Sequence, residues 1–154
     1  MYLGQNKILV RRFIDEVWNT GNISVANQIV SIGYIEHSPL PGQVPGFEGI
    51  KQAFRMLWNA FPDLHFKVED MFAEDHKLVV RGIFQGTHQG TIMGIPPSGE
   101  LVRIPEIHIF RLASGKILEH WGEFVCPAAL QEVYNLQHSL PTISVAVPQF
   151  SSAG

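Results

Sequence analysis

Cysteine is almost absent from this chain of 154 residues, which contains only Cys126. A single thiol excludes a disulfide within the chain and any zinc cluster built from several cysteines. Cys126 is most simply a buried thiol, although a nucleophilic role stays open. The sequence also lacks a charged leader before an apolar core, and it has no apolar run long enough to span a bilayer. We therefore expect a reducing, cytoplasmic setting and no membrane partner.

Clusters of basic residues are missing as well. Eleven Lys and Arg residues against fourteen Asp and Glu residues give a formal net charge of −3. No Lys/Arg-rich run offers a surface to nucleic acid or to an anionic membrane. The expected partner is therefore a small molecule or a second copy of the chain. Hydrophobic residues make up 45% of the sequence and charged residues 16%, a balance typical of one globular domain.

Several signatures of catalysis are not found. No GxSxG, P-loop or GxGxxG precedes a predicted helix, so acyl-serine chemistry, nucleotide hydrolysis and Rossmann dinucleotide binding are unsupported. HExxH is absent, and the segment KILEH lacks the first histidine of HxxEH. We therefore expect neither a metal nor a cofactor.

The spacing of apolar residues changes at Pro62. Before it, three- and four-residue steps predict helices over 6–18, 24–32 and 48–60, and YIEHS reads as a short extended piece entering the turn-rich SPLPGQVPG. After it, strands are predicted over 64–72, 77–90, 100–112 and 116–125. Helices followed by an antiparallel meander indicate an α+β domain.

The C-terminal part has a different pattern. Pro127 suits the first turn of a closing helix over 127–139. We assign residues 1–138 to the α+β domain and residues 139–154 to a tail or arm. In that tail Ile143, Val145 and Val147 alternate with small residues, so we expect an arm that packs on its own sheet or on a partner subunit.

The last two predicted strands can be registered by their turn, LASG. If Arg111 faces Lys116, the alternation of side chains places every second residue of each strand on the same face of the sheet. That face would carry Val102, Ile104, Glu106, His108 and Phe110 beside Ile117, Glu119, Trp121, Glu123 and Val125. The opposite face would carry Arg103, Ile107, Ile109, Arg111, Leu118, His120 and Phe124. Both faces are apolar enough to need a cover, which helices and a subunit interface would supply.

The first of these faces is the candidate cavity wall, because acids and an imidazole lie there among large apolar residues. A buried carboxylate without a cation has a raised pKa and can exchange protons near neutral pH. Glu106 with His108 would then form a base and a hydrogen-bond donor. The competing interpretation pairs these acids with Arg81 or Arg103, or places them at an open sheet edge.

Three further titratable residues lie on this face or beside its loops. Glu119 is nearest the turn and is expected to be solvated. His37 and His88 adjoin loops that could border a pocket, and structural histidines are the competing interpretation.

Six segments carry a family resemblance in the order VWNTGN, YIEHSP, GFEGIKQAF, FPDLHFKVED, GTHQGTIMGIPPSG and GKILEHWGEF. Together they resemble the SnoaL-like polyketide cyclase (ester cyclase) family over about residues 5 to 137. The resemblance implies a cone-shaped nuclear-transport-factor-like fold, in which N-terminal helices pack on a curved antiparallel sheet around an apolar pocket. It also implies a homodimer formed through the outer face of the sheet. The superfamily includes isomerases, dehydratases, epoxide hydrolases and binding modules, so the fold alone leaves function open.

The activity implied by this resemblance is closure of a polyketide ester ring by an intramolecular aldol reaction without metal or cofactor. The family pattern places an acid/base aspartate four residues after the tryptophan of the HW motif, where this chain has Val125. The remaining matches to the pattern are His37, His88, His120 and Trp121.

Two hypotheses follow from the replacement by Val125. In the first, Glu106 or Glu123 takes over the acid's role with His108, and the protein is a cyclase or isomerase. In the second, the pocket only binds a small molecule or serves isomerisation or hydration. The expected catalytic residues are Glu106, His108 and Glu123, and the expected substrate-binding residues are His37, His88, Trp121 and Val125.

Overall fold

The computed structural model describes residues 2–124. Val125, Cys126, the predicted closing helix and the arm over 139–154 lie outside the described residues.

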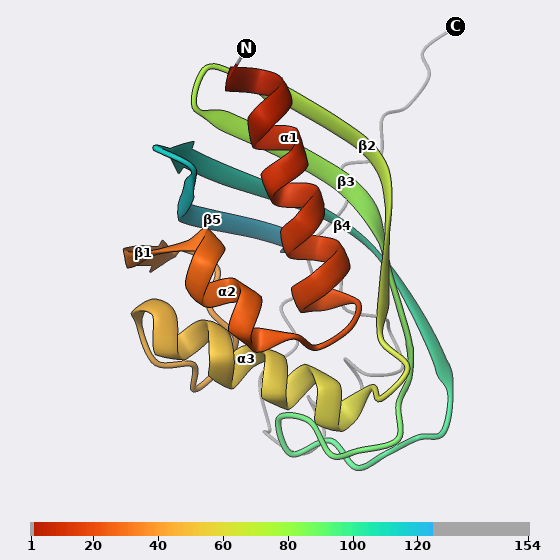
Figure 1. Ribbon diagram of the computed structural model, residues 1–154. Helices are drawn as coiled ribbons and strands as arrows, with labels where there is room; N and C mark the ends of the chain where they lie inside the picture. Colours follow the sequence, from red (N-terminus) through yellow and green to blue (C-terminus); the bar gives the residue numbers. More distant parts are fainter. Residues whose placement is uncertain (1, 125–154) are drawn as a thin grey trace, which may run out of the picture.

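Three helical segments come first in the chain (Figure 1). Helix α1 (Tyr2–Arg12) continues into a π-helix, η1 (Phe13–Trp18), and is followed by α2 (Ile23–Ile29). Helix α3 (Gly46–Ala60) comes after the turn-rich segment. These elements confirm the three predicted helices, with different ends.

The π-helix sets the direction of the side chains at the end of the first helix. The backbone N–H of Asn19 donates to the carbonyl of Ile14, five residues earlier, which is the wider spacing of a π turn. The Asn19 amide then exchanges two hydrogen bonds with the backbone of Phe66, at 2.7 and 3.1 Å. These bonds fix the end of η1 to the sheet, so Trp18 is held against the sheet's inner face.

The predicted second helix is wrong at its end. It stops at Ile29, and strand β1 (Val30–Glu36) begins at once. β-branched Val30 and Ile32 favour an extended chain, and β1 gains backbone partners by pairing parallel to β5. Ile32 is 99% exposed, so it does not belong to the apolar face of a helix.

Four long strands follow as the predicted meander: β2 (His65–Glu74), β3 (Lys77–Thr87), β4 (Leu101–Ala113) and β5 (Lys116–Phe124). With β1 they form one mixed sheet in the order β1-β5-β4-β3-β2. The helices cover one face of this sheet, and β2, β3 and β4 bend along their length toward α3 (Figure 1). The α+β prediction is confirmed. The extended piece predicted at YIEHS is confirmed over residues 34–36, whereas the earlier start of β1 and its parallel pairing with β5 were not predicted.

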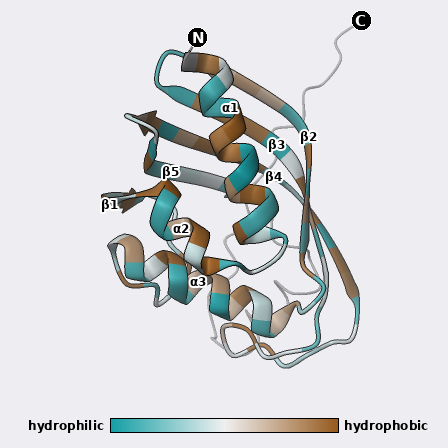
Figure 2. Ribbon diagram, in the orientation of Figure 1, coloured by the Kyte–Doolittle hydropathy of each residue, from teal (hydrophilic) through white to brown (hydrophobic). Residues whose placement is uncertain are grey.

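The core lies between the helices and the inner face of the sheet. Apolar and polar residues alternate along the helices and strands (Figure 2), and the apolar ones meet in this layer. The fully buried side chains include Val10, Ile14, Val17, Ile29, Leu78, Val80, Leu112 and Ile117.

The predicted register of the β4-β5 hairpin is wrong. Ala113 pairs with Lys116, because Ser114 and Gly115 form a two-residue turn with positive φ angles of 51° and 71°. The shorter turn alone would shift the pairing by two residues, and it would leave each side chain on its predicted face of the sheet. Leu112 then pairs with Ile117 and Arg111 with Glu119, which leaves Leu118 as the extra residue of a β-bulge. Beyond the bulge every side chain of β5 points to the face opposite the predicted one.

None of the helices within residues 2–124 combines the length and the apolar character needed to cross a membrane.

Candidate active site

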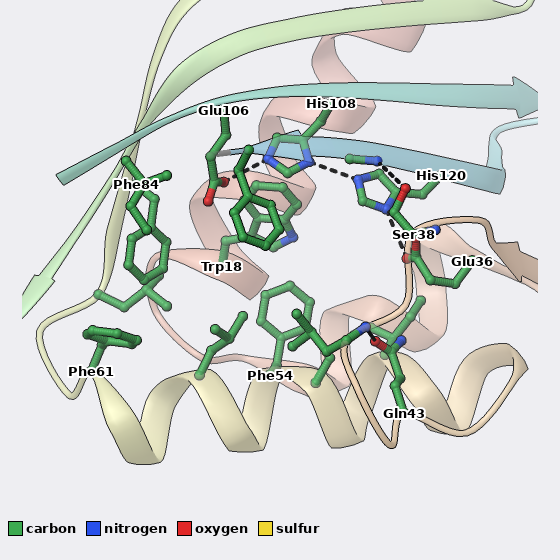
Figure 3. Close-up of a pocket in the computed structure, with 18 of the residues that line it drawn as sticks. Trp18, Glu36, Ser38, Gln43, Phe54, Phe61, Phe84, Glu106, His108 and His120 are labelled. Carbon is green, nitrogen blue, oxygen red and sulfur yellow. Dashed lines mark hydrogen bonds and ion pairs between the residues drawn. The ribbon is translucent and has the colours of Figure 1, made fainter. Parts of the chain in front are cut away.

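A cavity of about 190 Å³ lies between the inner face of the sheet and α3 (Figure 3). Its walls come from η1, α3, the inner faces of β1, β3, β4 and β5, and the loops after β1 and β3. Most of the lining is apolar. The larger apolar lining residues include Phe13, Trp18, Ile50, Phe54, Leu57, Phe61, Phe84, Ile104, Phe110 and Phe124.

The polar groups of the cavity are few and unbalanced in charge. Two carboxylates, Glu36 and Glu106, and two imidazoles, His108 and His120, line it. Among the described residues that form the lining there is no Lys or Arg. Such a cavity favours a neutral ligand, because a buried anion would find no cation there.

The two carboxylates and the two imidazoles form one hydrogen-bonded chain (Figure 3). Nδ1 of His120 lies 2.9 Å from both oxygens of Glu36. Nε2 of His120 lies 2.9 Å from Nδ1 of His108, and Nε2 of His108 lies 2.9 Å from Oε2 of Glu106. We call this set, Glu36, His120, His108 and Glu106, the acid–imidazole chain.

Three strands deliver the acid–imidazole chain to one place. Glu106 and His108 are two residues apart on β4 and therefore share its inner face. His120 reaches the same face because of the bulge at Leu118. Glu36 is paired with His120 in the β1-β5 ladder, so the parallel edge strand supplies the second carboxylate.

Gly122 leaves room for the contact between the two imidazoles. It lies opposite His108 in the β4-β5 ladder. A Cβ atom at residue 122 would lie 3.2 Å from Nδ1 of His108 and 3.3 Å from Cε1 of His120. Both distances are tighter than ordinary van der Waals contact, so a larger residue would push the rings apart.

Burial and hydrogen bonding set the charges at one end of the acid–imidazole chain. Burial opposes ionisation of Glu36, but hydrogen bonds from His120, Tyr34 and the Ser38 backbone outweigh it, and the pKa of Glu36 lies below its usual value. Burial, followed by the neighbouring Glu36 charge, raises the pKa of the Tyr34 hydroxyl. Burial also lowers the pKa of His120, against the opposing effect of Glu36. At neutral pH Glu36 is therefore ionised, whereas the Tyr34 hydroxyl and the His120 imidazole are neutral.

The rings around His108 keep water away from the centre of the acid–imidazole chain. The edge of Trp18 packs on His108 with ring centroids 4.8 Å apart, and Phe66 packs on it at 5.4 Å. His108 is 7% exposed. In such apolar surroundings a hydrogen bond is stronger, and an unpaired charge more costly, than in water.

The structure separates the three residues predicted to be catalytic. Glu106 and His108 lie together in the cavity wall. Glu123 pairs with Ile107 on the outer face and is exposed. The predicted orientation of Glu123 and Trp121 toward the pocket is therefore wrong, because the bulge reverses the alternation of β5.

His37, Trp121 and Glu119 meet on the outer face instead. The rings of His37 and Trp121 stack with centroids 4.4 Å apart, and Nε2 of His37 lies 3.0 Å from Oε1 of Glu119. Arg111 also donates to Glu119. We call these four residues the outer cluster. Hydrogen bonds from Arg111 and then His37 lower the pKa of Glu119, so this carboxylate is paired rather than freely solvated as predicted.

His88 and Arg81 also lie apart from the cavity. His88 is fully buried behind Phe61, and its Nδ1 accepts a hydrogen bond from the backbone N–H of Ser98 at 3.3 Å. Arg81 pairs with Asp70 at 2.5 Å and Glu69 at 3.0 Å, so its suggested pairing with the predicted acids is not observed. Val125, the fourth residue predicted to bind substrate, lies outside the described residues.

Sequence reasoning missed Glu36 and placed His120 on the wrong face. A signal for Glu36 was present, since Tyr34, Glu36 and Ser38 alternate along YIEHS and all line the cavity. For His120, the Ser-Gly pair in ASGK signalled a two-residue turn, but no residue type in the strand marks Leu118 as a bulge.

The four side chains are arranged in a line rather than around a point. Within residues 2–124, no group of three or more His, Cys, Asp or Glu side chains has the geometry to hold a metal ion.

Helices packed on a mixed five-strand open sheet, with a cavity between them, define an α+β protein of the nuclear-transport-factor-like class. The chain belongs to the SnoaL-like polyketide cyclase family, whose model matches residues 8–125.

Named relatives agree with this assignment. The aklanonic acid methyl ester cyclases DauD of Streptomyces sp. (strain C5) and DnrD of Streptomyces peucetius are each 29% identical to the chain over 126 residues. The alignments cover 76% of this chain and 75% and 83% of those proteins. A solved SnoaL-like protein from Jannaschia sp. CCS1 is 30% identical, with a TM-score of 0.74 and coverage of 85% of this chain and 92% of that one.

Proposed function

We propose that this protein is a cofactor-free cyclase that closes a ring in a small, apolar, oxygenated polyketide ester, with Glu106 and His108 as its acid–base pair. The observation that carries this proposal is the acid–imidazole chain set into the wall of a mostly apolar cavity. Family membership supports the reaction class, and the two curated relatives are named for the cyclisation of aklanonic acid methyl ester.

The proposed reaction starts at Glu106. Its carboxylate accepts a proton from a carbon beside a carbonyl group, which leaves an enolate. The enolate carbon attacks a second carbonyl of the same molecule, so a carbon–carbon bond forms and the carbonyl π bond breaks. The resulting alkoxide takes a proton back from Glu106. The product is an isomer of the substrate, and loss of water in a later step would give a dehydrated product.

The cavity supports this chemistry in two ways. Its apolar walls favour a folded substrate chain, in which the two reacting carbons are close. Donors are also available for the negative oxygen. Gln43 lines the cavity, and because its Oε1 accepts from the Leu40 backbone at 2.9 Å, its amide nitrogen is the group left to donate. The hydroxyl of Ser38, which accepts from the backbone N–H of Gly122 at 3.0 Å, also lines the cavity, near Glu36 and His120 (Figure 3). Fixed donors in a dry site stabilise an oxyanion more than water does.

The test is incubation of the protein with aklanonic acid methyl ester and other polyketide esters, followed by mass spectrometry. We expect a product of unchanged mass, or one lighter by water, with a new retention time. Tight binding without conversion of any ester would instead support a non-catalytic binding protein. An inactive protein that gains turnover on Val125→Asp would show that the acid's role was lost rather than moved to Glu106.

A further inference from the structure

Glu36 is surrounded by hydrogen-bond donors. Its Oε2 accepts from the Tyr34 hydroxyl at 2.5 Å, and its Oε1 accepts from the Ser38 backbone N–H at 2.9 Å. Nδ1 of His120 lies within 2.9 Å of both oxygens. The Tyr34 hydroxyl and the Ser38 backbone N–H hold the Glu36 carboxylate in its ionised form, which can only accept hydrogen bonds.

This fixes the proton on His120. Because Glu36 only accepts, Nδ1 of His120 carries a hydrogen. His120 is also kept neutral, since burial lowers its pKa, and a neutral imidazole has one donor and one acceptor nitrogen. Its Nε2 is therefore an acceptor.

The same reasoning passes to the next ring. Nδ1 of His108 lies 2.9 Å from Nε2 of His120, so this nitrogen must carry the hydrogen of that bond. Only the third bond, between Nε2 of His108 and Oε2 of Glu106, is left without an assigned donor. It can hold its proton on Glu106, as a carboxylic acid beside a neutral ring, or on His108, as an imidazolium beside a carboxylate.

We propose that Glu36 and His120 are positioning residues, which fix the protons of the first two hydrogen bonds and leave one mobile proton between His108 and Glu106. A proton moving toward His108 turns Glu106 into a base without any change in the net charge of the buried chain. Since no cation stands among the described lining residues, this proton movement avoids the cost of an additional buried anion. The consequence for turnover rests on the proposed cyclase function, whereas the proton positions rest on the hydrogen-bond geometry and on the burial of His120.

The proton positions can be read by NMR from long-range ¹H–¹⁵N spectra of the full chain labelled with ¹⁵N-histidine. Signals of the two rings are identified by their loss in His108→Gln and His120→Gln. At pH 7 we expect His120 and His108 to be protonated at Nδ1, with Nε2 of His120 bare. A proton on Nε2 of His120 in the unaltered protein would overturn the inference.

Two variants test the part played by Glu36. Glu36→Leu removes the acceptor, so both nitrogens of His120 should move to shifts averaged over two tautomers. Tyr34→Phe removes one donor but keeps the carboxylate, so the shifts of His120 should stay in the Nδ1-protonated range. Unchanged His120 shifts in Glu36→Leu would also overturn the inference.

These spectra do not depend on turnover. The expected tautomers in a protein that converts no ester would refute the cyclase proposal and leave the proton assignment standing. Turnover together with a different tautomer would refute only the proton assignment.

Discussion

The two faces of β5 carry the same kinds of side chain in opposite surroundings. On the inner face, His120 joins Glu36, His108 and Glu106 in a cavity wall that has no cation in its described lining. On the outer face, Glu119 joins His37 and the cation Arg111. Both faces pair carboxylates with imidazoles at close to 3 Å.

The difference shows what turns an acid–imidazole pair into a candidate catalytic group. In the outer cluster, Arg111 neutralises Glu119 and lowers its pKa, so this carboxylate is a weak base held for structure. No described residue of the cavity lining is a cation, so the charge of the acid–imidazole chain is balanced by moving a proton between its members. Variants that exchange the properties of the two faces therefore test the comparison directly.

The largest effect is expected for Glu106→Gln, which removes the proposed acid/base and keeps the side chain's size. Turnover of a polyketide ester should fall by about 10²- to 10⁴-fold, the usual contribution of a general acid–base group. The matched change on the outer face, Glu119→Gln, should leave turnover close to that of the unaltered protein. Steady-state rates measured by mass spectrometry, with circular dichroism to verify folding, decide between them. Equal losses in both variants would contradict the comparison.

A smaller effect is expected for Gly122→Ala. The new Cβ would press on both imidazoles of the acid–imidazole chain, so the hydrogen bond between His108 and His120 should lengthen. We expect turnover to fall by about 10- to 100-fold, since small misplacements of catalytic groups have effects of this size. Gly33→Ala, on strand β1, is the control, because its Cβ would meet nothing nearer than 3.9 Å. A Gly122→Ala protein with unaltered turnover would show that the contact between the rings is not needed.

The pH dependence of stability should also separate the two faces. The pKa of His120 is lower in the folded chain than in the unfolded one, so the unfolded chain binds protons more readily. The free energy of unfolding should therefore fall as pH drops below about 6.5, the ordinary histidine pKa. The lowered pKa of Glu36 adds a further fall below about pH 4.3.

Urea unfolding between about pH 7 and 5 measures the histidine part of this effect. His120→Gln should make the dependence on pH shallower, because the depressed group is gone. Glu119→Gln should leave the slope unchanged in this range, since a carboxyl with a lowered pKa titrates below it. A slope that survives in His120→Gln would place its origin elsewhere.

The smallest effect is expected for the stability of Glu119→Gln itself. Arg111 is 37% exposed, so the pair it forms with Glu119 is open to solvent and to salt. The thermal midpoint should fall slightly at low ionic strength and match that of the unaltered protein near 1 M salt, where the Debye length is about 3 Å. A large fall that persists at high salt would mean that the outer cluster is as strongly coupled as the inner chain.

Much of the fold could be predicted from the sequence, because the periodicity of apolar residues records which face of each element is buried. The strands of the meander and the inner face of β4, with Glu106 and His108, follow from this pattern. Only the end of β1 was predicted, as the extended piece at YIEHS. Its place in the sheet could not be found in this way, since its partner, β5, is distant in the chain. The homodimer and the cytoplasmic setting stay predictions.

The site was half predictable for a related reason. Glu106 and His108 precede any irregularity in their strand, so simple alternation places them correctly. Glu123 and Trp121 follow the bulge, whose single extra residue reverses every later assignment. Glu36 and His120 meet only through the β1-β5 pairing, which no spacing within either segment reveals.

The bulge at Leu118 also bears on how this chain should be aligned with its relatives. A relative that lacks this one residue could form a regular strand and still present the equivalents of His120 and Gly122 to the cavity. A one-residue gap placed near Trp121 would instead assign every later residue of the strand to the opposite face of the sheet. Alignments of this strand should therefore place single gaps at Leu118, because the same gap a few residues later would describe a protein with different chemistry.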